Sequence, residues 1–331
     1  MKKAIAAKIL ECTGLRQLVH HTYRWSGLLG LNYHRIGDGL ASIYDRGLWS
    51  ATSDAFAEQL RFLKRHVDII SPSDLPRALA EKRGRYAIVT FDDGYCDNYD
   101  VALPILKREG VAATFFVASG YIDSPSLPWW DEIAWMVRTS QRRGLELVPW
   151  LDAPLPFDEP HREMAILALL RGYKAMPAEN TSRYLEAIAA AAGIERRADH
   201  ANDQLWMTWD MLREMKAAGM TIGGHSVSHP VLSRMSPQQQ RHEILECGRR
   251  LADELGEPMQ SFSYPVGNAS AFDAATRDSL HEAGVSYAFS YYGGYRRFDD
   301  WDDYDVRRVA IETEIDTDWF RSIVTLPQLF A

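Results

Sequence analysis

The feature that most constrains the fold is an alternation of short apolar runs with longer segments of helical periodicity. The apolar runs are rich in β-branched and aromatic residues, and turn residues follow them directly. This alternation predicts βα units and a parallel sheet. A length of 331 residues suits a single α/β barrel. The expected strands are 27–33, 86–91, 112–117, 220–222, 261–264 and 286–289, and the expected helices are 53–66 (with Ser53 or Asp54 as N-cap), 98–109, 208–218, 236–255 and 271–283.

The alternation loosens over residues 124–205, where helical runs near 129–139, 159–171 and 178–192 surround a proline-rich turn. We interpret this stretch as a helical insertion in the barrel. The prediction is therefore one catalytic domain, 1–331.

The first 26 residues predict an N-terminal helix, amphipathic over 4–24. The basic start resembles a signal sequence, but charged residues interrupt the apolar stretch and no convincing small-residue cleavage site follows. No run of 18 apolar residues exists, so no transmembrane helix is expected. We expect a cytoplasmic protein whose first helix packs on the domain. Peripheral membrane contact through 4–24, and hence membrane association, is the second interpretation.

Charge and cysteine usage exclude some classes of function. The formal net charge of -8 argues against a general nucleic-acid binder, which would carry a basic stripe. The three cysteines, Cys12, Cys96 and Cys247, show no CxxC spacing. A thiolate zinc site and a disulfide framework are therefore not expected.

The first candidate for chemistry is Asp92-Asp93-Gly94, at the end of the strand expected over 86–91. Strand ends gather at one face of a parallel barrel, and active sites lie there. Gly94 permits a sharp turn, so both carboxylates can converge on one centre. One can then bind a metal while the other handles protons. The alternative is an acidic turn with an aspartate helix cap.

The second candidate is the pair His225 and His229, which follows Gly223-Gly224 at another strand end. Histidines four residues apart can bind a metal together, and the glycines permit close backbone approach. A pair of surface histidines in a turn is the alternative. Two imidazoles and one carboxylate leave coordination positions open for a water and a substrate carbonyl. A non-haem iron oxygenase uses the same ligand set.

Two weaker signals also stand at strand ends. The run 261–267 (SFSYPVG) ends in a turn that can aim a backbone N–H at an oxyanion. His34 ends the first strand, in the run 31–34 (LNYH). An ordinary turn and a structural histidine are the alternatives.

The runs TFDDGY, HSVSH and SYPVG, in this order and spacing, resemble the polysaccharide deacetylases of carbohydrate esterase family 4, the NodB-homology domain. The resemblance covers about 28–123 and 206–312. It implies a distorted (β/α) barrel and hydrolysis of N- or O-acetyl groups on sugars with a divalent metal, often zinc. We expect Zn²⁺ here, with other divalent transition metals as alternatives.

By this resemblance Asp92 is the catalytic base, and the metal ligands are Asp93, His225 and His229. The backbone N–H of Val266 is the candidate oxyanion donor. The arginine that pairs with the base in this family is absent from the third motif, where Ser263 stands. Arg308 is our choice for that role, with Arg307 and Arg35 as alternatives.

The family's general-acid histidine normally lies near the C-terminus, but no histidine follows His281. The run LNYH resembles that motif moved to the N-terminus, as in the circularly permuted branch, so His34 is assigned as the acid. It must be protonated when the amine leaves, so we expect a carboxylate partner. The candidate substrate contacts are Tyr95, Tyr264, Pro265 and Trp130; core packing is the alternative for most of the tryptophans.

The leading hypothesis is a metal-dependent hydrolase that removes an N-acetyl group from an amino sugar of a glycan or glycoconjugate. Removal of another acyl group, such as formyl, from a lipid- or nucleotide-linked sugar is the alternative. A catalytically silent glycan-binding module is a third hypothesis, but such a module has no need for a base beside a metal site.

Overall fold

The computed structural model describes residues 2–14, 16, 25–146, 150, 154–158, 161–196 and 204–331. Within these residues, seven parallel strands form a barrel, and β1 closes it by pairing with β13 on one side and β5 on the other. The predicted α/β barrel is thereby confirmed. The barrel strands, in order around the barrel, are β1 (Gly27–Tyr33), β5 (Arg85–Phe91), β6 (Thr114–Val117), β9 (Thr221–Gly224), β10 (Ser261–Ser263), β11 (Tyr287–Gly293) and β13 (Val306–Ala310).

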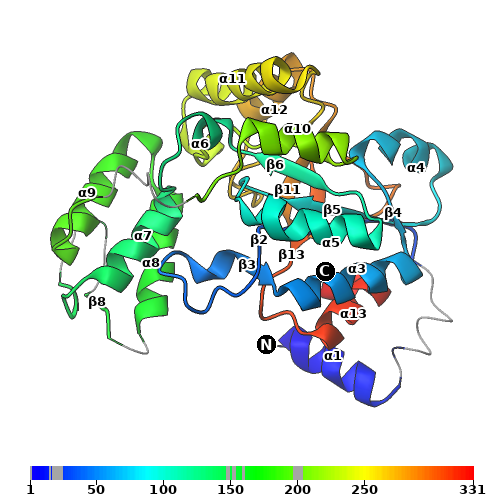
Figure 1. Ribbon diagram of the computed structural model, residues 1–331, viewed down its shortest axis with the longest axis horizontal. Helices are drawn as coiled ribbons and strands as arrows, with labels where there is room; N and C mark the ends of the chain where they lie inside the picture. Colours follow the sequence, from blue (N-terminus) through cyan, green and yellow to red (C-terminus); the bar gives the residue numbers. More distant parts are fainter. Residues whose placement is uncertain are drawn as a thin grey trace.

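Helices surround the barrel (Figure 1). The helices are α3 (Ser53–His66), α4 (Leu75–Glu81), α5 (Leu103–Glu109), α6 (Ser119–Asp123), α10 (Trp209–Ala217), α11 (Pro237–Leu255), α12 (Ala274–Glu282), α13 (Thr317–Thr325) and α14 (Pro327–Phe330). The short strands are β2 (Arg35–Ile36), β3 (Trp49–Ala51), β4 (Asp68–Ile69) and β12 (Tyr295–Arg296).

Several predicted boundaries need correction. The side chain of Thr52 caps α3, one residue before the expected cap. The helix expected over 98–109 begins as a π-helix, Asn98–Ala102, and ends as predicted before Gly110, whose φ of 63° suits a helix stop. The strand β13 was not predicted, because two adjacent arginines interrupt its apolar pattern.

Side chains alternate along the strands, so every second residue points into the barrel. The barrel interior near the amino ends of the strands is apolar, with Leu28, Ile88 and Val306 in one buried cluster. Two positions further along the same strands stand Gly30, Thr90 and Arg308. The interior thus changes from apolar to polar toward the carboxyl ends of the strands, where the chemistry was expected.

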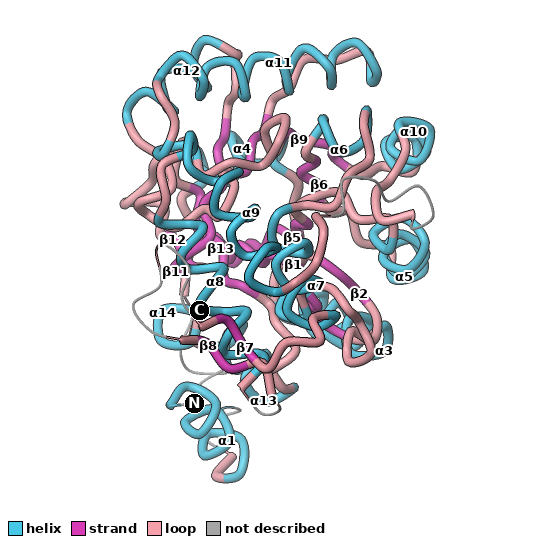
Figure 2. Tube along the Cα trace, turned by 90° about the vertical axis from the view of Figure 1, so that its left-hand side faces the viewer, coloured by secondary structure: helices cyan, strands magenta, loops and turns pink. Residues whose placement is uncertain are grey.

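The insertion forms a helical layer over that end of the barrel, as two views at right angles show (Figures 1 and 2). Its elements are α7 (Trp129–Thr139), α8 (Arg162–Ala175), α9 (Thr181–Ala192) and the hairpin of β7 (Gly144–Leu145) with β8 (Leu155–Pro156). Its apolar cluster includes Tyr95, from the loop after β5, and Tyr121 of α6, so the insertion shares one core with segments that follow barrel strands.

The N-terminal helix α1 (Lys2–Cys12) packs against α13, and Lys3 donates to the carbonyl of Ala331. The helix predicted over 4–24 is wrong in extent, because it ends at Cys12 and Gly14 then has a φ of 70°. Residues 15 and 17–24 of that prediction lie outside the described residues. Among the described residues, no helix has the length and apolar character needed to cross a membrane.

Candidate active site

A buried ion pair stands at the centre of the site. Arg308 of β13 donates from its two terminal nitrogens to the two oxygens of Asp92, at 2.8 and 2.9 Å. The same guanidinium donates to Asn32, Thr90 and Ser263 and to the carbonyl of Ser290. Each side of this charged group therefore has a hydrogen-bond partner, as burial of a charge requires.

The barrel interior is shaped to hold this arginine. A Cβ on Gly30 would lie 2.8 Å from the Arg308 side chain, so the missing side chain leaves room for it. The rings of Phe116 and Phe289 lie 5.5 and 5.9 Å from the guanidinium carbon. Of the two alternatives, Arg307 contacts Asp305 and Arg35 contacts Asp97. The structure therefore places Arg308, our choice from the sequence, beside Asp92.

The environment of Asp92 keeps it ionised. Burial alone would raise its pKa, but the charge and hydrogen bonds of Arg308 hold the pKa well below its ordinary value. Oδ2 also accepts from Asn32 at 3.1 Å and from Ser263 at 3.0 Å. Oδ1 accepts only from Arg308 among the described residues, so it keeps capacity for another proton donor.

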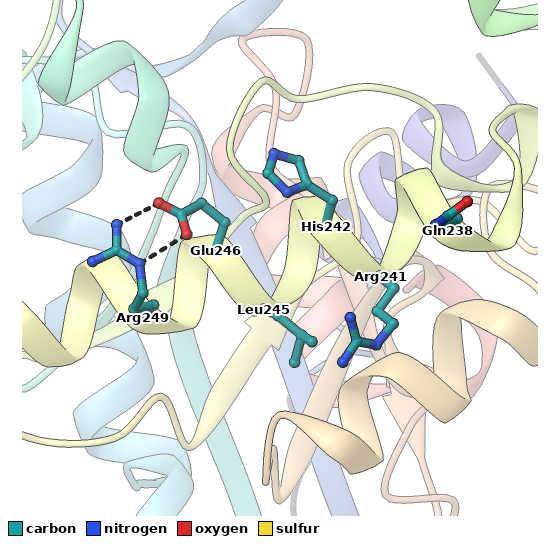
Figure 3. Close-up of a pocket in the computed structure, with 6 residues that line it drawn as sticks. All are labelled: Gln238, Arg241, His242, Leu245, Glu246 and Arg249. Carbon is teal, nitrogen blue, oxygen red and sulfur yellow. Dashed lines mark hydrogen bonds and ion pairs between the residues drawn. The ribbon is translucent and has the colours of Figure 1, made fainter.

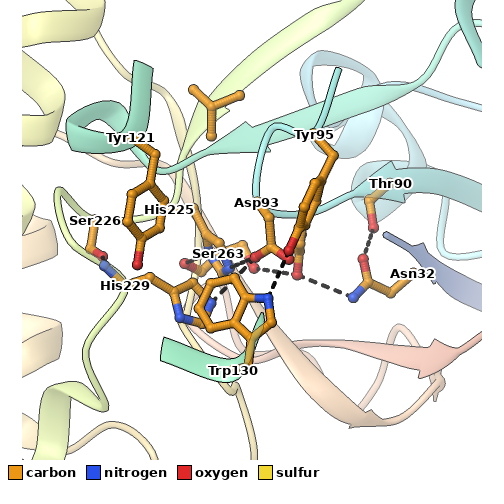
Figure 4. Close-up of polar contacts among 12 residues, drawn as sticks. Asn32, Thr90, Asp93, Tyr95, Tyr121, Trp130, His225, Ser226, His229 and Ser263 are labelled. Carbon is orange, nitrogen blue, oxygen red and sulfur yellow. Dashed lines mark hydrogen bonds and ion pairs between the residues drawn. The ribbon is translucent and has the colours of Figure 1, made fainter. Parts of the chain in front are cut away.

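Asp93, His225 and His229 form the one cluster of metal-ligand type among the described residues, with ligand atoms within 4.8 Å of one another (Figure 4). The Nε2 atoms of the two histidines lie 3.5 and 3.4 Å from Oδ1 of Asp93. All three side chains are buried, and Oδ1 of Asp93 has no hydrogen-bond donor in the part of the chain described. A buried, unsatisfied carboxylate oxygen facing two imidazoles fits a bound cation.

The two histidines are held and charged differently. Nδ1 of His225 lies 2.7 Å from the carbonyl oxygen of Ser263, which can only accept, so Nδ1 carries a proton and Nε2 faces Asp93. Burial opposes a charge on His225, but the carboxylates of Asp92 and Asp93 raise its pKa above the ordinary value. Burial lowers the pKa of His229 to about 3, so its ring is neutral and has the protonation state of a metal ligand.

Unusual backbone conformations are concentrated here. Asp93, Ser226, His229 and Val266 have φ between 54° and 78°, in a region that side chains other than glycine seldom adopt. All four lie in the predicted motifs. Strain of this kind persists only where the surroundings hold it, which is typical of functional loops.

A buried carboxylate that the sequence analysis missed holds the HSVSH loop. Glu243 of α11 accepts from the backbone of Val227 and Ser228 at 2.8 and 2.9 Å, and from the Ser228 hydroxyl at 2.6 Å. A sequence signal existed: Glu243 falls on the same helical stripe as Ile244 and Cys247, which are buried. An acid on an apolar stripe indicates a specific partner.

His34 stands at the end of β1, with its ring 5.5 Å from that of Tyr291 in an edge-on contact. Its imidazole interacts electrostatically with Asp92, Asp93 and Glu312. The Tyr291 hydroxyl donates to Glu312 at 3.4 Å. Glu312 is therefore a candidate for the expected carboxylate partner, although no motif marks it in the sequence.

Val266 lies in the turn after β10, and its N–H has no acceptor among the described residues. Two of the predicted substrate contacts in this region are wrong. Tyr264 belongs to the buried core, because its ring stacks on Phe272 and its hydroxyl donates to the carbonyl of Tyr304. Pro265 is also buried. Neither side chain therefore leaves exposed surface for a sugar.

Tyr95 and Trp130 need correction as well. Tyr95 is fully buried, with its hydroxyl bonded to Trp130 and Asp131. Trp130 is buried against the ring of His229, at 4.4 Å between ring centroids. Both side chains pack beneath the metal-ligand cluster and expose no surface that a sugar could contact.

A surface groove lies elsewhere, on the outer face of α11 (Figure 3). Its lining residues are Gln238, Arg241, His242, Leu245, Glu246 and Arg249. Its arginines are already paired, Arg249 with Glu246 and Arg241 with Glu282. Because Glu243 faces the HSVSH loop from the opposite side of α11, this groove does not open to the metal-ligand cluster.

Fold and site together define an α/β-barrel enzyme whose chemistry sits at the carboxyl ends of the strands. A model of the polysaccharide deacetylase family matches residues 80–146 and 167–288, more than half of the chain. The chain belongs to the polysaccharide deacetylase family. The resemblance drawn from the three motifs is thereby confirmed.

The chain is distantly similar to several named proteins. YxkH of Bacillus subtilis (strain 168), assigned to the polysaccharide deacetylases, is 21% identical over 180 residues, which are 54% of this chain and 36% of that protein. The deacetylase PplD of Streptococcus pyogenes, solved with acetate, is 18% identical, with a TM-score of 0.59 over 92% of this chain and 98% of that one. IcaB of Ammonifex degensii is 19% identical, with a TM-score of 0.56 over the same shares. These structures support the fold.

Proposed function

We propose that the protein is a metal-dependent hydrolase that removes an N-acetyl group from an amino sugar of a glycan or glycoconjugate. One observation carries the proposal: the buried cluster of Asp93, His225 and His229 lies beside a carboxylate, Asp92, that Arg308 keeps ionised. Family membership supplies the reaction class. A binding module would not need an ionised carboxylate at this position.

Asp93, His225 and His229 would hold a divalent metal, with zinc the cation that best suits two imidazoles and one carboxylate. When bound, the metal would polarise the acetamide carbonyl and acidify a water. The unsatisfied Oδ1 of Asp93 supports this assignment, because the cation would supply its missing partner.

The remaining groups move protons and hold charge. Oδ1 of Asp92 is the acceptor for the proton of the attacking water, since Oδ2 already accepts three hydrogen bonds. The N–H of Val266, which has no acceptor among the described residues, would stabilise the oxyanion as the carbonyl carbon becomes tetrahedral. His34 gives a proton to the sugar nitrogen as the C–N bond breaks. Acetate and a free amine result.

The test is a panel of acylated amino sugars, free, polymeric, nucleotide-linked and lipid-linked, offered to the zinc-loaded protein while released acid is measured. We expect the protein to release acetate from at least one N-acetylated sugar of the panel. Formate in place of acetate would select the alternative deacylase, on a lipid- or nucleotide-linked sugar. If the metal-loaded protein releases no acid from any sugar, the proposal that it is a hydrolase is contradicted.

We also propose peripheral contact of α1 with a membrane surface. Ile5 and Ile9 are 55% and 57% exposed, and Lys2 and Lys8 are exposed on the same short helix. Apolar and basic side chains together favour an anionic lipid surface. Sedimentation with anionic vesicles tests this, and an Ile5→Ser/Ile9→Ser variant that sediments like the wild type would contradict it.

A further inference from the structure

We infer that the first turn of α7 positions His229 for metal binding, through Trp130 and the buried hydroxyl of Tyr95. The helical insertion then helps to build the metal site rather than only cover it. This inference rests on the proposed function, because it takes the cluster of Asp93, His225 and His229 to bind a metal.

The two histidines differ in how their rings are held. The Nδ1 proton of His225 goes to the carbonyl of Ser263 at 2.7 Å. Nδ1 of His229 is buried and has no partner in the part of the chain that the structure describes. A ligating histidine normally keeps its orientation through such a second hydrogen bond. Another contact must therefore fix the ring of His229.

Two tryptophans at the start of α7 provide that contact. The indole of Trp130 meets the imidazole of His229 at 4.4 Å between centroids and an angle of 63°. Nε1 of Trp129 donates to the backbone carbonyl of His229 at 3.3 Å. Figure 4 shows the Trp130 indole lying against the His229 ring. One tryptophan restrains the ring and the other the main chain, whose φ of 54° needs support.

The Trp130 ring is itself held by hydrogen bonds. Its Nε1 donates to the Tyr95 hydroxyl at 2.7 Å, and that hydroxyl donates to Oδ2 of Asp131 at 2.7 Å. Oδ1 of Asp131 accepts from the backbone of Asp45 at 2.9 Å. Since Tyr95 follows Asp93 by two residues, this chain of bonds ties the loop of one metal ligand to the ring of another.

All links in this chain are buried: Tyr95 is 0%, Asp131 0% and Trp130 4% exposed. Loss of the Tyr95 hydroxyl would leave the Trp130 N–H and a carboxylate oxygen without partners. Neither Tyr95 nor Asp131 has surface to offer a sugar. They act through His229, as positioning residues.

The experiment compares Tyr95→Phe and Trp130→Phe with the wild type, by chelator competition for zinc and by the absorption spectrum of bound cobalt. Both variants keep an aromatic ring. Each lacks one partner of the hydrogen bond between Nε1 of Trp130 and the Tyr95 hydroxyl. Tyr99→Phe is the matched control, because it removes an exposed hydroxyl that bonds to Glu214, away from the cluster. Circular dichroism verifies folding.

We expect zinc affinity to fall about 10-fold or more in both variants, the usual effect of losing support behind a ligand. The cobalt spectrum should also change, which a merely structural role would not cause, and the control should match the wild type. If Tyr95→Phe does not fold, Trp130→Phe carries the test. Wild-type affinity and an unchanged spectrum in a folded variant would overturn the inference. A wild-type protein that binds no metal would instead overturn the proposed function.

Discussion

Arg308 and Asp92 form a bidentate ion pair inside the barrel, with the guanidinium nitrogens 2.8 and 2.9 Å from the carboxylate oxygens. The arginine comes from the last barrel strand, while the motif that supplies it in the family carries Ser263 here. Ser263 donates to the same carboxylate at 3.0 Å, so the third motif still contacts the base.

Arg308→Met should destabilise the fold by about 3–5 kcal/mol, because it leaves a buried carboxylate without its partner. Arg308→Lys keeps a charge but not the paired geometry. The pKa of Asp92 should then rise, and the acid limb of the activity profile should move to higher pH. Urea unfolding and the pH dependence of kcat measure these effects. The control is Arg307→Met, which removes a half-buried neighbour paired with Asp305. An unchanged acid limb in Arg308→Lys would contradict the role.

Asp92→Asn should retain the metal and the fold but lose about 100-fold or more in turnover, the scale of general acid–base catalysis. The amide nearly conserves the shape of the carboxylate but cannot take the proton of water. Metal analysis and kcat on the same preparation are the measurements. A near-normal rate would move the base to another residue.

His34→Ala should slow deacetylation of an N-acetyl sugar far more than hydrolysis of an activated aryl acetate, because only the amine needs a proton to leave. Glu312→Gln should shift the ratio of the two rates in the same direction by a smaller factor, since its carboxylate interacts with His34. Zinc content should stay constant in both variants. Equal losses on both substrates, or loss of zinc, would point to a structural or ligating histidine.

The buried Asp131 predicts a pH-dependent stability. Burial raises its pKa to about 7 against the opposing charge of Arg35 and the hydrogen bond from Tyr95. The folded state thus holds a proton that the unfolded state releases near pH 4, so stability is greatest below that pH and is lost as pH rises through about 7. Between about pH 4 and pH 7, Asp131 changes the free energy of unfolding by at most about 4 kcal/mol.

Urea unfolding between pH 5 and 8 measures this loss. Asp131→Asn has no proton to release, so the difference in free energy of unfolding between wild type and variant should shrink or reverse as pH rises. Parallel pH profiles of the two proteins would show that Asp131 is ionised in the folded state throughout.

Motif residues could be located from the sequence because strand ends meet at one face of a parallel barrel. The choice between Arg307 and Arg308 depends on strand register, since neighbouring side chains point to opposite faces. No local pattern marks that register. The pairing of Leu31 with Val309 decides it, and it directs Arg308 inward.

The substrate contacts were wrong for a related reason. Tyr95 and Tyr264 stand inside the motifs, but membership of a motif does not give a side chain access to the substrate. Both side chains pack inward, where each hydroxyl donates a hydrogen bond within the protein. Glu312 and Asp131 were missed because their partners are far away in the chain, and only the fold brings them together.

The decisive measurement is a zinc titration of the chelator-stripped protein, with acetate release followed at each point. We expect no release without metal, a rise that saturates near one zinc per chain, and neither binding nor release in His229→Ala. Acetate release that persists without metal, or full zinc occupancy in His229→Ala, would contradict it.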